Sequence, residues 1–157
     1  MLKQVSGSLD YFVARLPRKP AAYFFLFLAW AITLWFLSAG NPGPKDGPDI
    51  PHLDKVAHFL YFFGGGCLLA AYVGLKWSEA SSRRLFIVVA LICCIIGRLD
   101  EYHQGFTPGR SGNDNGDWLA DILGGASGVL AVIWLMLPRI SDLKAPKPKK
   151  SSEKKEI

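Results

Sequence analysis

Hydrophobic residues along this chain gather in four long segments, each bounded by charged or turn-forming residues. The segments cover residues 21–39, 56–75, 85–104 and 118–137. Each is close to the roughly 20 residues that an α-helix needs to cross about 30 Å of hydrocarbon. Half of the 157 residues are hydrophobic, which agrees with this class. The pattern predicts an all-α polytopic membrane protein whose single membrane domain, residues 21–137, has four transmembrane helices.

The segment 85–104 is the least regular of the four. Its uninterrupted apolar part, residues 85–97, covers only about 20 Å as a helix, which is too short to span a bilayer. Either this segment is re-entrant, or the helix continues through Arg98, Asp100 and Glu101. Continuation is favoured, because the next strong helix breaker is Pro108.

Basic residues lie mostly at one end of the four segments. They precede residue 21, separate residue 75 from residue 85 and follow residue 137, whereas acidic residues dominate the other connections. By the positive-inside rule the basic ends face the cytoplasm, so both termini are expected inside and the topology is N-in/C-in. The net charge of +5 at pH 7 therefore reflects the basic residues expected on the cytoplasmic side and does not indicate nucleic-acid binding.

The flanking segments and the cysteines add little chemistry. Residues 1–20 are expected to form a basic cytoplasmic segment, and the helix after it is interpreted as a retained anchor because its apolar run is too long for a secretory signal. Residues 138–157, rich in Lys, Pro and Ser towards the end, predict a disordered cytoplasmic tail that attracts anionic lipid headgroups. Cys67, Cys93 and Cys94 lie at apolar positions and predict neither a disulfide nor a zinc site.

Three of the four segments carry ionisable residues at their outer ends only. Helical spacing places the polar residues of each segment on one face. They are Asp54 and His58, then Asp100, His103 and Gln104, then Asp117 and Asp121. Charged side chains in a membrane face the bundle interior, so the three faces are expected to converge beneath the outer loops. Gly64–Gly66 and the pair Gly124 and Gly128 would allow close helix approach, whereas segment 21–39 is expected at the periphery.

Several separated motifs resemble the VanZ-like family of membrane proteins. They are Asp54-Lys55-x-x-His58-Phe59, Asp100-Glu101-Tyr102-His103-Gln104-Gly105-Phe106, Pro108-Gly109-Arg110-Ser111, and Asp117-Trp118-Leu119-Ala120-Asp121 followed by Gly124 and Gly125. The resemblance covers residues 54–137. It implies a small integral protein of the bacterial cytoplasmic (inner) membrane, in a family named after a teicoplanin-resistance factor, and it names a fold better than a reaction. Either Asp114 or Asp117 takes the acidic role of the last motif.

Structural roles compete with functional ones at several of these residues. Asp117 stands where a helix begins, and a carboxylate there is suited to cap free amides. Asp121 lies one turn deeper, where no cap is available, so it needs a partner. Candidate partners are Arg110, Lys55 and His58. Arg98 and Glu101 are three residues apart on one helix and are expected to pair with each other.

The loop between the last two segments presents an arginine. Pro108 and Gly109 suit the centre of a type II turn, which would place Arg110 above the helices. Its guanidinium group is suited to phosphate or carboxylate, so it either binds an anionic ligand or forms a salt bridge with Asp114 or Asp117. Both interpretations stay open.

The candidate site residues fall into two sets. The candidate acid/base or polar-site residues are His58, Asp100, Glu101 and Asp121. The candidate ligand-binding residues are Lys55, His103, Gln104, Arg110 and Asp117. His58 can titrate near neutral pH. There is no His-Glu-x-x-His pair and no thiolate set, so neither a metal nor another cofactor is expected.

Three classes of function remain open. The first is an outer-facing polar site that binds or acts on an amphiphilic cell-envelope molecule, such as a lipid-linked precursor, with an effect on glycopeptide or envelope-stress tolerance. The second is a non-enzymatic scaffold that acts through partners, with structural polar clusters. The third is a proton-coupled carrier, which is disfavoured because the ionisable groups lie near one face only. The sequence does not distinguish an enzyme from a binding protein.

Overall fold

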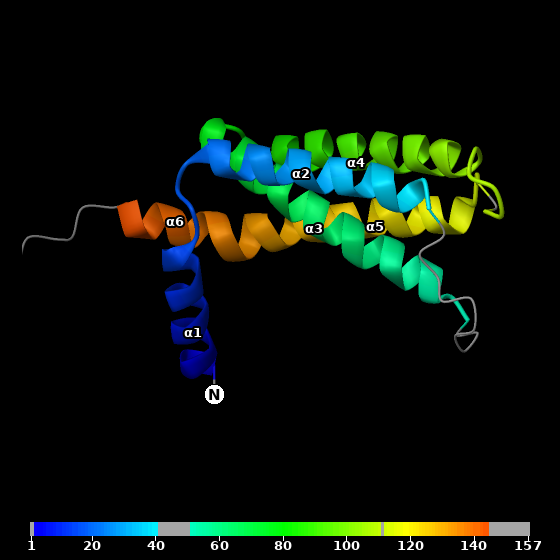
Figure 1. Ribbon diagram of the computed structural model, residues 1–157. Coiled ribbons are helices and arrows are strands. Elements are labelled where there is room, and N and C mark those ends of the chain that lie inside the picture. Colours follow the sequence, from blue (N-terminus) through cyan, green and yellow to red (C-terminus); the bar gives the residue numbers. More distant parts are fainter. Residues whose placement is uncertain (1, 41–50, 111, 145–157) are drawn as a thin grey trace, which may run out of the picture.

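The computed structural model of the protein describes residues 2–40, 51–110 and 112–144 (Figure 1). All regular structure in these ranges is helical. The elements are α1 (Leu2–Arg15), α2 (Pro20–Ser38), α3 (Leu53–Lys76), α4 (Ser82–Gln104), α5 (Asn115–Ala131), the π-helical segment η1 (Val132–Met136) and α6 (Leu137–Lys144). The all-helical fold class expected from the sequence is confirmed for these residues.

Helices α2 to α5 form an antiparallel bundle (Figure 1). The end of α2, the start of α3, the end of α4 and the start of α5 lie together at one end, which we call the polar end. The opposite end holds α6, the connection from α3 to α4, and α1, which turns away from the bundle. All the sequence segments with outer ionisable residues therefore meet at the polar end.

Glycine residues bring α3 and α5 into backbone contact. A Cβ atom at Gly124 would overlap the carbonyl oxygen of Phe59, and one at Gly128 would overlap that of Phe63. Any larger side chain would force the helices apart. The close approach expected at Gly124 and Gly128 is confirmed. Gly64 takes no part in it, because a Cβ atom there would have no neighbouring atom within 4 Å.

Helix α2 is fixed to the bundle by reciprocal hydrogen bonds. The indole Nε1 of Trp30 donates to the carbonyl oxygen of Tyr61 at 3.1 Å, and the Tyr61 hydroxyl donates to the carbonyl oxygen of Trp30 at 2.8 Å. Gly65 leaves the space that the Trp30 ring occupies. Most apolar side chains of α2 are exposed, as expected of a peripheral helix, yet its inner face packs firmly on α3.

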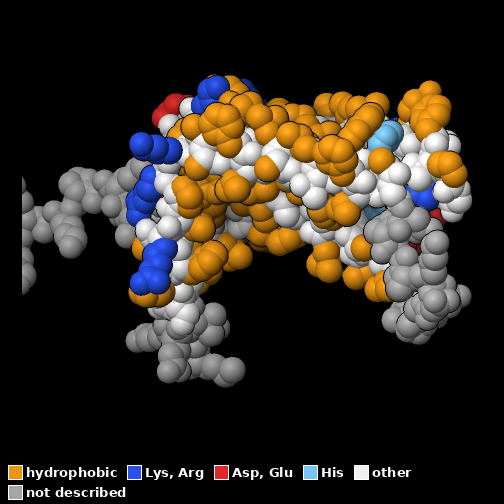
Figure 2. Space-filling view, viewed as in Figure 1, with side chains coloured by type: hydrophobic (Ala, Val, Ile, Leu, Met, Phe, Trp, Pro, Cys, Tyr) orange, Lys and Arg blue, Asp and Glu red, His pale blue; other side chains and the backbone are white. Residues whose placement is uncertain are grey.

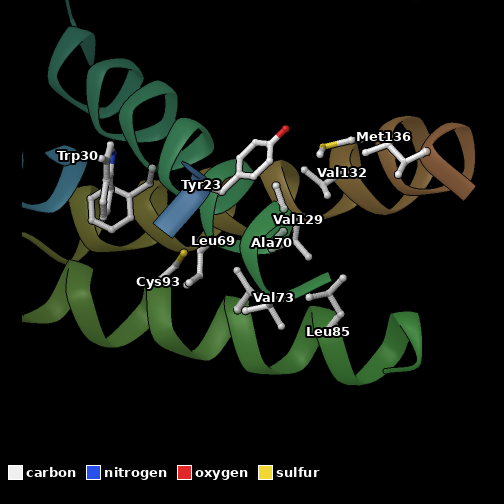
Figure 3. Close-up of a cluster of buried hydrophobic side chains, with 14 of the residues drawn as sticks. Tyr23, Trp30, Leu69, Ala70, Val73, Leu85, Cys93, Val129, Val132 and Met136 are labelled. Carbon is white, nitrogen blue, oxygen red and sulfur yellow. The ribbon is translucent and has the colours of Figure 1, made fainter. Parts of the chain in front are cut away.

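The hydrophobic core runs along the middle of the bundle. Figure 3 shows side chains from α2, α3, α4, α5 and η1 meeting in one cluster. Its labelled members are Tyr23, Trp30, Leu69, Ala70, Val73, Leu85, Cys93, Val129, Val132 and Met136. Cys67, Cys93 and Cys94 are free thiols, and no disulfide was expected among them.

Among the described residues, three helical stretches are long and apolar enough to cross a membrane, one fewer than expected. They are Pro20–Ser38, Leu53–Lys76 and Asn115–Ile140. Helix α4 is not among them, because charged residues lie near both of its ends. It is nevertheless one continuous helix of 23 residues that passes through Arg98 and Glu101 without a break. Continuation of this helix, the alternative favoured from the sequence, is therefore what the structure shows.

The lateral surface of the bundle is strongly apolar (Figure 2). Phe25, Phe36, Leu60, Leu99 and Trp134 each expose more than three-fifths of their surface. Such continuous apolar exposure is unusual for a protein surrounded by water and is typical of one surrounded by lipid. Lys and Arg side chains gather at the end opposite the polar end (Figure 2). These observations indicate a membrane protein.

Two short helices occupy segments for which no helix was expected. Helix α1 lies within residues 1–20 and packs on α6, where Arg139 Nε is 2.8 Å from Asp10 Oδ1. Val13 and Ile140 are buried there. Helix α6 continues the rod of α5 and η1 through Lys144, so residues 138–144 are helical rather than disordered. The rest of the expected tail, residues 145–157, lies outside the described residues.

Candidate functional site

The buried polar side chains of the described residues all lie at the polar end. They are Ser38, Asp100, Glu101, Gln104, Asp117 and Asp121. Burying such groups costs free energy unless they find hydrogen-bond or charge partners. Their partners therefore define the chemistry of this end of the molecule.

Four neighbouring side chains, from three helices, form what we call the inner cluster. Its members are His58 on α3, Asp100 and Glu101 on α4, and Asp121 on α5. One nitrogen or oxygen atom of each lies within 4.8 Å of the corresponding atom of the others. Nδ1 of His58 is 2.9 Å from Oδ1 of Asp121, so His58 is the partner that Asp121 was expected to need. The structure thus brings all four candidate polar-site residues together.

Asp100 is held by two side chains. The hydroxyl of Ser38 donates to its Oδ1, and the amide of Gln104 donates to its Oδ2 at 2.7 Å. The contact from Ser38 was not foreseen, because α2 lacks a polar face. Its only sequence signal is that Ser38 ends an otherwise apolar helix at the polar end. Gln104, a candidate ligand-binding residue, is therefore hydrogen-bonded to Asp100 in the structure.

Two carboxylate oxygens of the inner cluster have no hydrogen-bond partner among the described residues. Glu101 uses its Oε2 to accept the backbone N–H of Asp114 at 2.7 Å, but its Oε1 is buried and unpartnered. Asp121 is paired through Oδ1, but its Oδ2 is buried and unpartnered beside Gly97. Leaving a buried polar atom unpaired typically costs about 1–3 kcal/mol.

Next to the inner cluster lies an outer cluster formed by Lys55, Asp54, Asp114 and Asp117. The Lys55 ammonium is 3.0 Å from Asp54, 3.2 Å from Asp114 and 3.0 Å from Asp117. Nε2 of His58 lies 3.9 Å from Oδ2 of Asp117, which links the two clusters. Lys55 therefore acts as the counterion of three aspartates.

The start of α5 is capped by Asp114 and not by Asp117, which corrects the sequence interpretation. The Asp114 carboxylate accepts the N–H groups of Gly116 at 2.6 Å and Asp117 at 3.4 Å. The hydrogen bond from the Gly116 N–H, and then the one from Lys55, lower the pKa of the Asp114 carboxyl. Because α5 begins at Asn115, the Asp117 side chain is already within the helix and is free to bind Lys55.

Arg98 and Glu101 do not form the ion pair expected from their spacing. The guanidinium group of Arg98 lies over the ring of Trp118, 5.5 Å from its centre, on the exposed side of α4. Glu101 is fully buried on the other side, where Asp114 donates to it. Their side chains point in different directions, so Glu101 has no arginine as counterion among the described ion pairs.

Arg110 closes the loop onto α2. The expected type II turn is present, with φ of 84° at Gly109 and a hydrogen bond from Arg110 N to Thr107 O at 3.1 Å. The Arg110 Nη1 donates to the carbonyl oxygens of Leu37 at 3.3 Å and Gly40 at 3.0 Å. Neither salt bridge weighed from the sequence is among the described ion pairs. A positive charge beside these carbonyl oxygens stabilises the C-terminus of α2, which is the negative end of the helix dipole.

His103 lies apart from both clusters. Its ring stacks on Trp35 of α2, with 3.7 Å between ring centres. The structure therefore divides the candidate ligand-binding residues. Lys55 and Asp117 belong to the outer cluster, whereas His103 and Arg110 contact α2. A cavity of about 360 Å³ lies elsewhere, at the basic end, lined by side chains that include Trp77 and Val88.

The family assignment rests on most of the chain. The VanZ/LLP1 family model matches residues 11–137, which include α2 to α5 and both clusters. Neither the curated proteins nor the solved structures contain a match to this chain. The chain belongs to the VanZ/LLP1 family, and its apolar helices indicate a membrane protein.

Proposed function

We propose that the protein crosses the bacterial cytoplasmic membrane four times and uses its polar end, on the outer face, to bind the headgroup of an amphiphilic cell-envelope molecule. The observation that carries this proposal is the inner cluster. Three buried carboxylates and a histidine lie at one end of a bundle that is otherwise apolar. Ionisable groups at such a depth are costly and usually mark a functional site.

The fourth span in this proposal is α4. Its 23 residues make about 34 Å of helix, enough to cross the hydrocarbon of a membrane. Its charged residues lie near its two ends, where they reach the interfaces or the polar end. With α4 included, the basic residues gather at one end of the four spans, which supports N-in/C-in topology and an outward-facing polar end.

The distribution of charge favours a headgroup that donates hydrogen bonds. The outer cluster has three aspartates for one lysine, and the inner cluster adds three carboxylates for one histidine. Arg110, the residue considered for an anionic group, already donates to two carbonyl oxygens through Nη1. Hydroxyl or amino groups of a sugar or peptide headgroup would match this surplus of acceptors.

A chemical step is open to the same residues. His58 is oriented by Asp121 through its Nδ1, and its other ring nitrogen faces Asp117. A histidine held between carboxylates is a common arrangement for accepting and releasing a proton. The proposal requires binding and does not require catalysis.

A second candidate function is a scaffold that acts through partner proteins. It is favoured by the hydrogen bonds that connect the helices at the polar end, from Ser38 to Asp100 and from Asp114 to Glu101. In this alternative the clusters lock the bundle and bind nothing. The proton-coupled carrier has less support, since the described buried ionisable groups do not continue beyond Asp121 towards the basic end.

Lipid co-purification separates the two candidates. We would purify wild type and His58→Gln in nanodiscs formed from native membrane and identify the enriched lipids by mass spectrometry. Glu79→Gln, a change at the opposite end, is the control. Binding at the polar end predicts an enriched envelope amphiphile that His58→Gln loses and Glu79→Gln keeps, with a matching loss of glycopeptide tolerance at equal protein abundance. The same lipids in all three proteins would contradict the proposal.

A further inference from the structure

We infer that the inner cluster binds one divalent transition-metal cation, with His58, Glu101 and Asp121 as ligands and Asp100 completing the set. The inference concerns the same inner cluster as the proposed headgroup function, but it requires no bound headgroup. It rests on the arrangement of donor atoms, on two buried oxygen atoms that lack partners among the described residues, and on the scarcity of positive charge around the cluster.

The donor atoms are spaced for a metal ion. Bonds from a metal to nitrogen and oxygen ligands are about 2.0–2.2 Å long, so opposite ligands of an octahedral ion lie about 4.0–4.4 Å apart and neighbouring ones about 3 Å apart. The four donor atoms lie within 4.8 Å of one another, and His58 Nδ1 is 2.9 Å from Asp121 Oδ1. Small side-chain adjustments would bring all four atoms to bonding distance of a common centre.

The unpartnered oxygens give the second, independent observation. Glu101 and Asp121 are both fully buried, yet Glu101 Oε1 and Asp121 Oδ2 have no hydrogen-bond partner in the part of the chain that the structure describes. A Cβ atom at Gly97 would lie 2.7 Å from Asp121 Oδ2, so the glycine preserves the space beside this oxygen. A bound cation would supply a partner that the described residues do not provide for these carboxylates.

The charge of the inner cluster also calls for a cation. Among the described ion pairs, His58 is the only basic side chain that contacts its carboxylates. Lys55 binds the outer cluster, and Arg110 binds backbone carbonyls. The outer cluster makes a useful contrast, because its carboxylates already share the Lys55 ammonium and do not need a metal.

Surrounding hydrogen bonds hold the proposed ligands in place. Ser38 and Gln104 donate to Asp100, and the Asp114 N–H donates to Glu101. Groups of this kind orient ligands in known metal sites and commonly change affinity 10- to 100-fold when removed. One imidazole and three carboxylates suit Mn²⁺, Fe²⁺ or Zn²⁺ better than a soft thiolate-seeking ion.

The test uses the full-length protein in detergent, with any affinity tag removed, after chelation and dialysis. Mn²⁺ and Zn²⁺ are titrated separately by calorimetry, and bound metal is counted by mass spectrometry. The inference predicts one equivalent per chain for wild type. We expect at least 10-fold weaker binding for Asp121→Asn and, because it removes a positioning residue, for Ser38→Ala. The matched control is Asp54→Asn in the outer cluster, for which we expect unchanged affinity.

Wild type alone can overturn the inference, so it stays testable even where a variant fails to fold. No bound Mn²⁺ or Zn²⁺ in wild type would overturn the inference. Equal binding by wild type, Asp121→Asn and Ser38→Ala would place the metal elsewhere on the chain. Co²⁺ substitution gives a further readout, since its visible absorption should change on binding to wild type and not to Asp121→Asn.

Discussion

The hydroxyl of Ser38 on α2 donates a hydrogen bond to the buried carboxylate of Asp100 on α4. This contact connects the most apolar helix of the bundle to the inner cluster. It lies beside a second link, in which Thr107 donates to the carbonyl oxygen of Ser38 at 3.0 Å. The end of α2 is therefore part of the polar end.

Removing the Ser38 hydroxyl should destabilise the fold. In Ser38→Ala, Asp100 Oδ1 loses its partner while it stays buried, and we expect a loss of about 1–3 kcal/mol in unfolding free energy. Thermal unfolding in one detergent, without added metal, measures this loss. Thr33→Val on the same helix is the control, because Thr33 is exposed and its hydroxyl donates to its own helix backbone. Equal losses in both variants would contradict a special role for Ser38.

Substitution of Gly124 should separate α3 from α5. The Cβ of alanine would overlap the carbonyl oxygen of Phe59, a contact that backbone movement must relieve. We expect Gly124→Ala to cost about 1–3 kcal/mol, as overpacking of a tight interface usually does. Unfolding midpoints in detergent provide the measurement.

Gly64→Ala is the matched control for this interface. Gly64 lies on the same α3 helix, and a Cβ there has no neighbour within 4 Å. Alanine favours a helix over glycine by up to about 1 kcal/mol, so this change should leave the midpoint unchanged or raise it. A fall as large as that of Gly124→Ala would show that the loss does not come from helix contact.

The polar periodicity of three segments predicted that His58, Asp100 and Asp121 meet, although it placed His103 on the same face as Asp100 and left Glu101 off that face. His58, Asp100 and Asp121 each lie on the face that helical spacing selects, and burial of charge in a membrane decides that those faces turn inward. Helix packing at Gly124 and Gly128 follows from the same reasoning. These features follow from the spacing of residues along each helix and from the cost of exposing charged groups to lipid.

Other features of the polar end could not be predicted from the spacing of residues along a helix. Asp114 and Asp117 are both suitable caps, but α5 begins at Asn115, so Asp114 is the cap and Asp117 already lies within the helix. Ser38 gave no periodic signal, since a single hydroxyl ends an apolar helix. The proposed metal site was not expected from the sequence either, because its ligands come from three helices and have no short spacing to recognise.

Replacing Lys55 should expose how strongly it neutralises the outer cluster. Lys55→Met leaves Asp117, which is mostly buried, without its counterion, whereas Asp54 and Asp114 remain open to solvent. We expect a loss of about 1–2 kcal/mol, between the values typical of exposed and fully buried pairs. Denaturation at low and high salt measures it, and Lys55→Arg, which keeps the charge, should recover most of the stability.

Cysteine labelling tests the proposed orientation. Phe106 is exposed in the loop at the polar end, and Ser78 is exposed in the connection at the basic end. In intact cells a membrane-impermeant maleimide should label Phe106→Cys, and it should label Ser78→Cys only after permeabilisation. The wild-type protein, whose three cysteines are buried or partly buried, gives the background. The reverse pattern would overturn N-in/C-in topology.

The Glu101→Gln variant should be stabilised by metal much less than wild type. Without metal, the change removes one charge from three crowded carboxylates, so we expect an unfolding midpoint equal to or above that of wild type. With Mn²⁺ at 100 times its dissociation constant, wild type should gain about 2.7 kcal/mol, whereas the variant should gain much less. Thermal unfolding in chelator and in Mn²⁺ measures both effects. A midpoint that falls clearly in chelator would show instead that the Glu101 carboxylate stabilises the bundle through its hydrogen bond from Asp114.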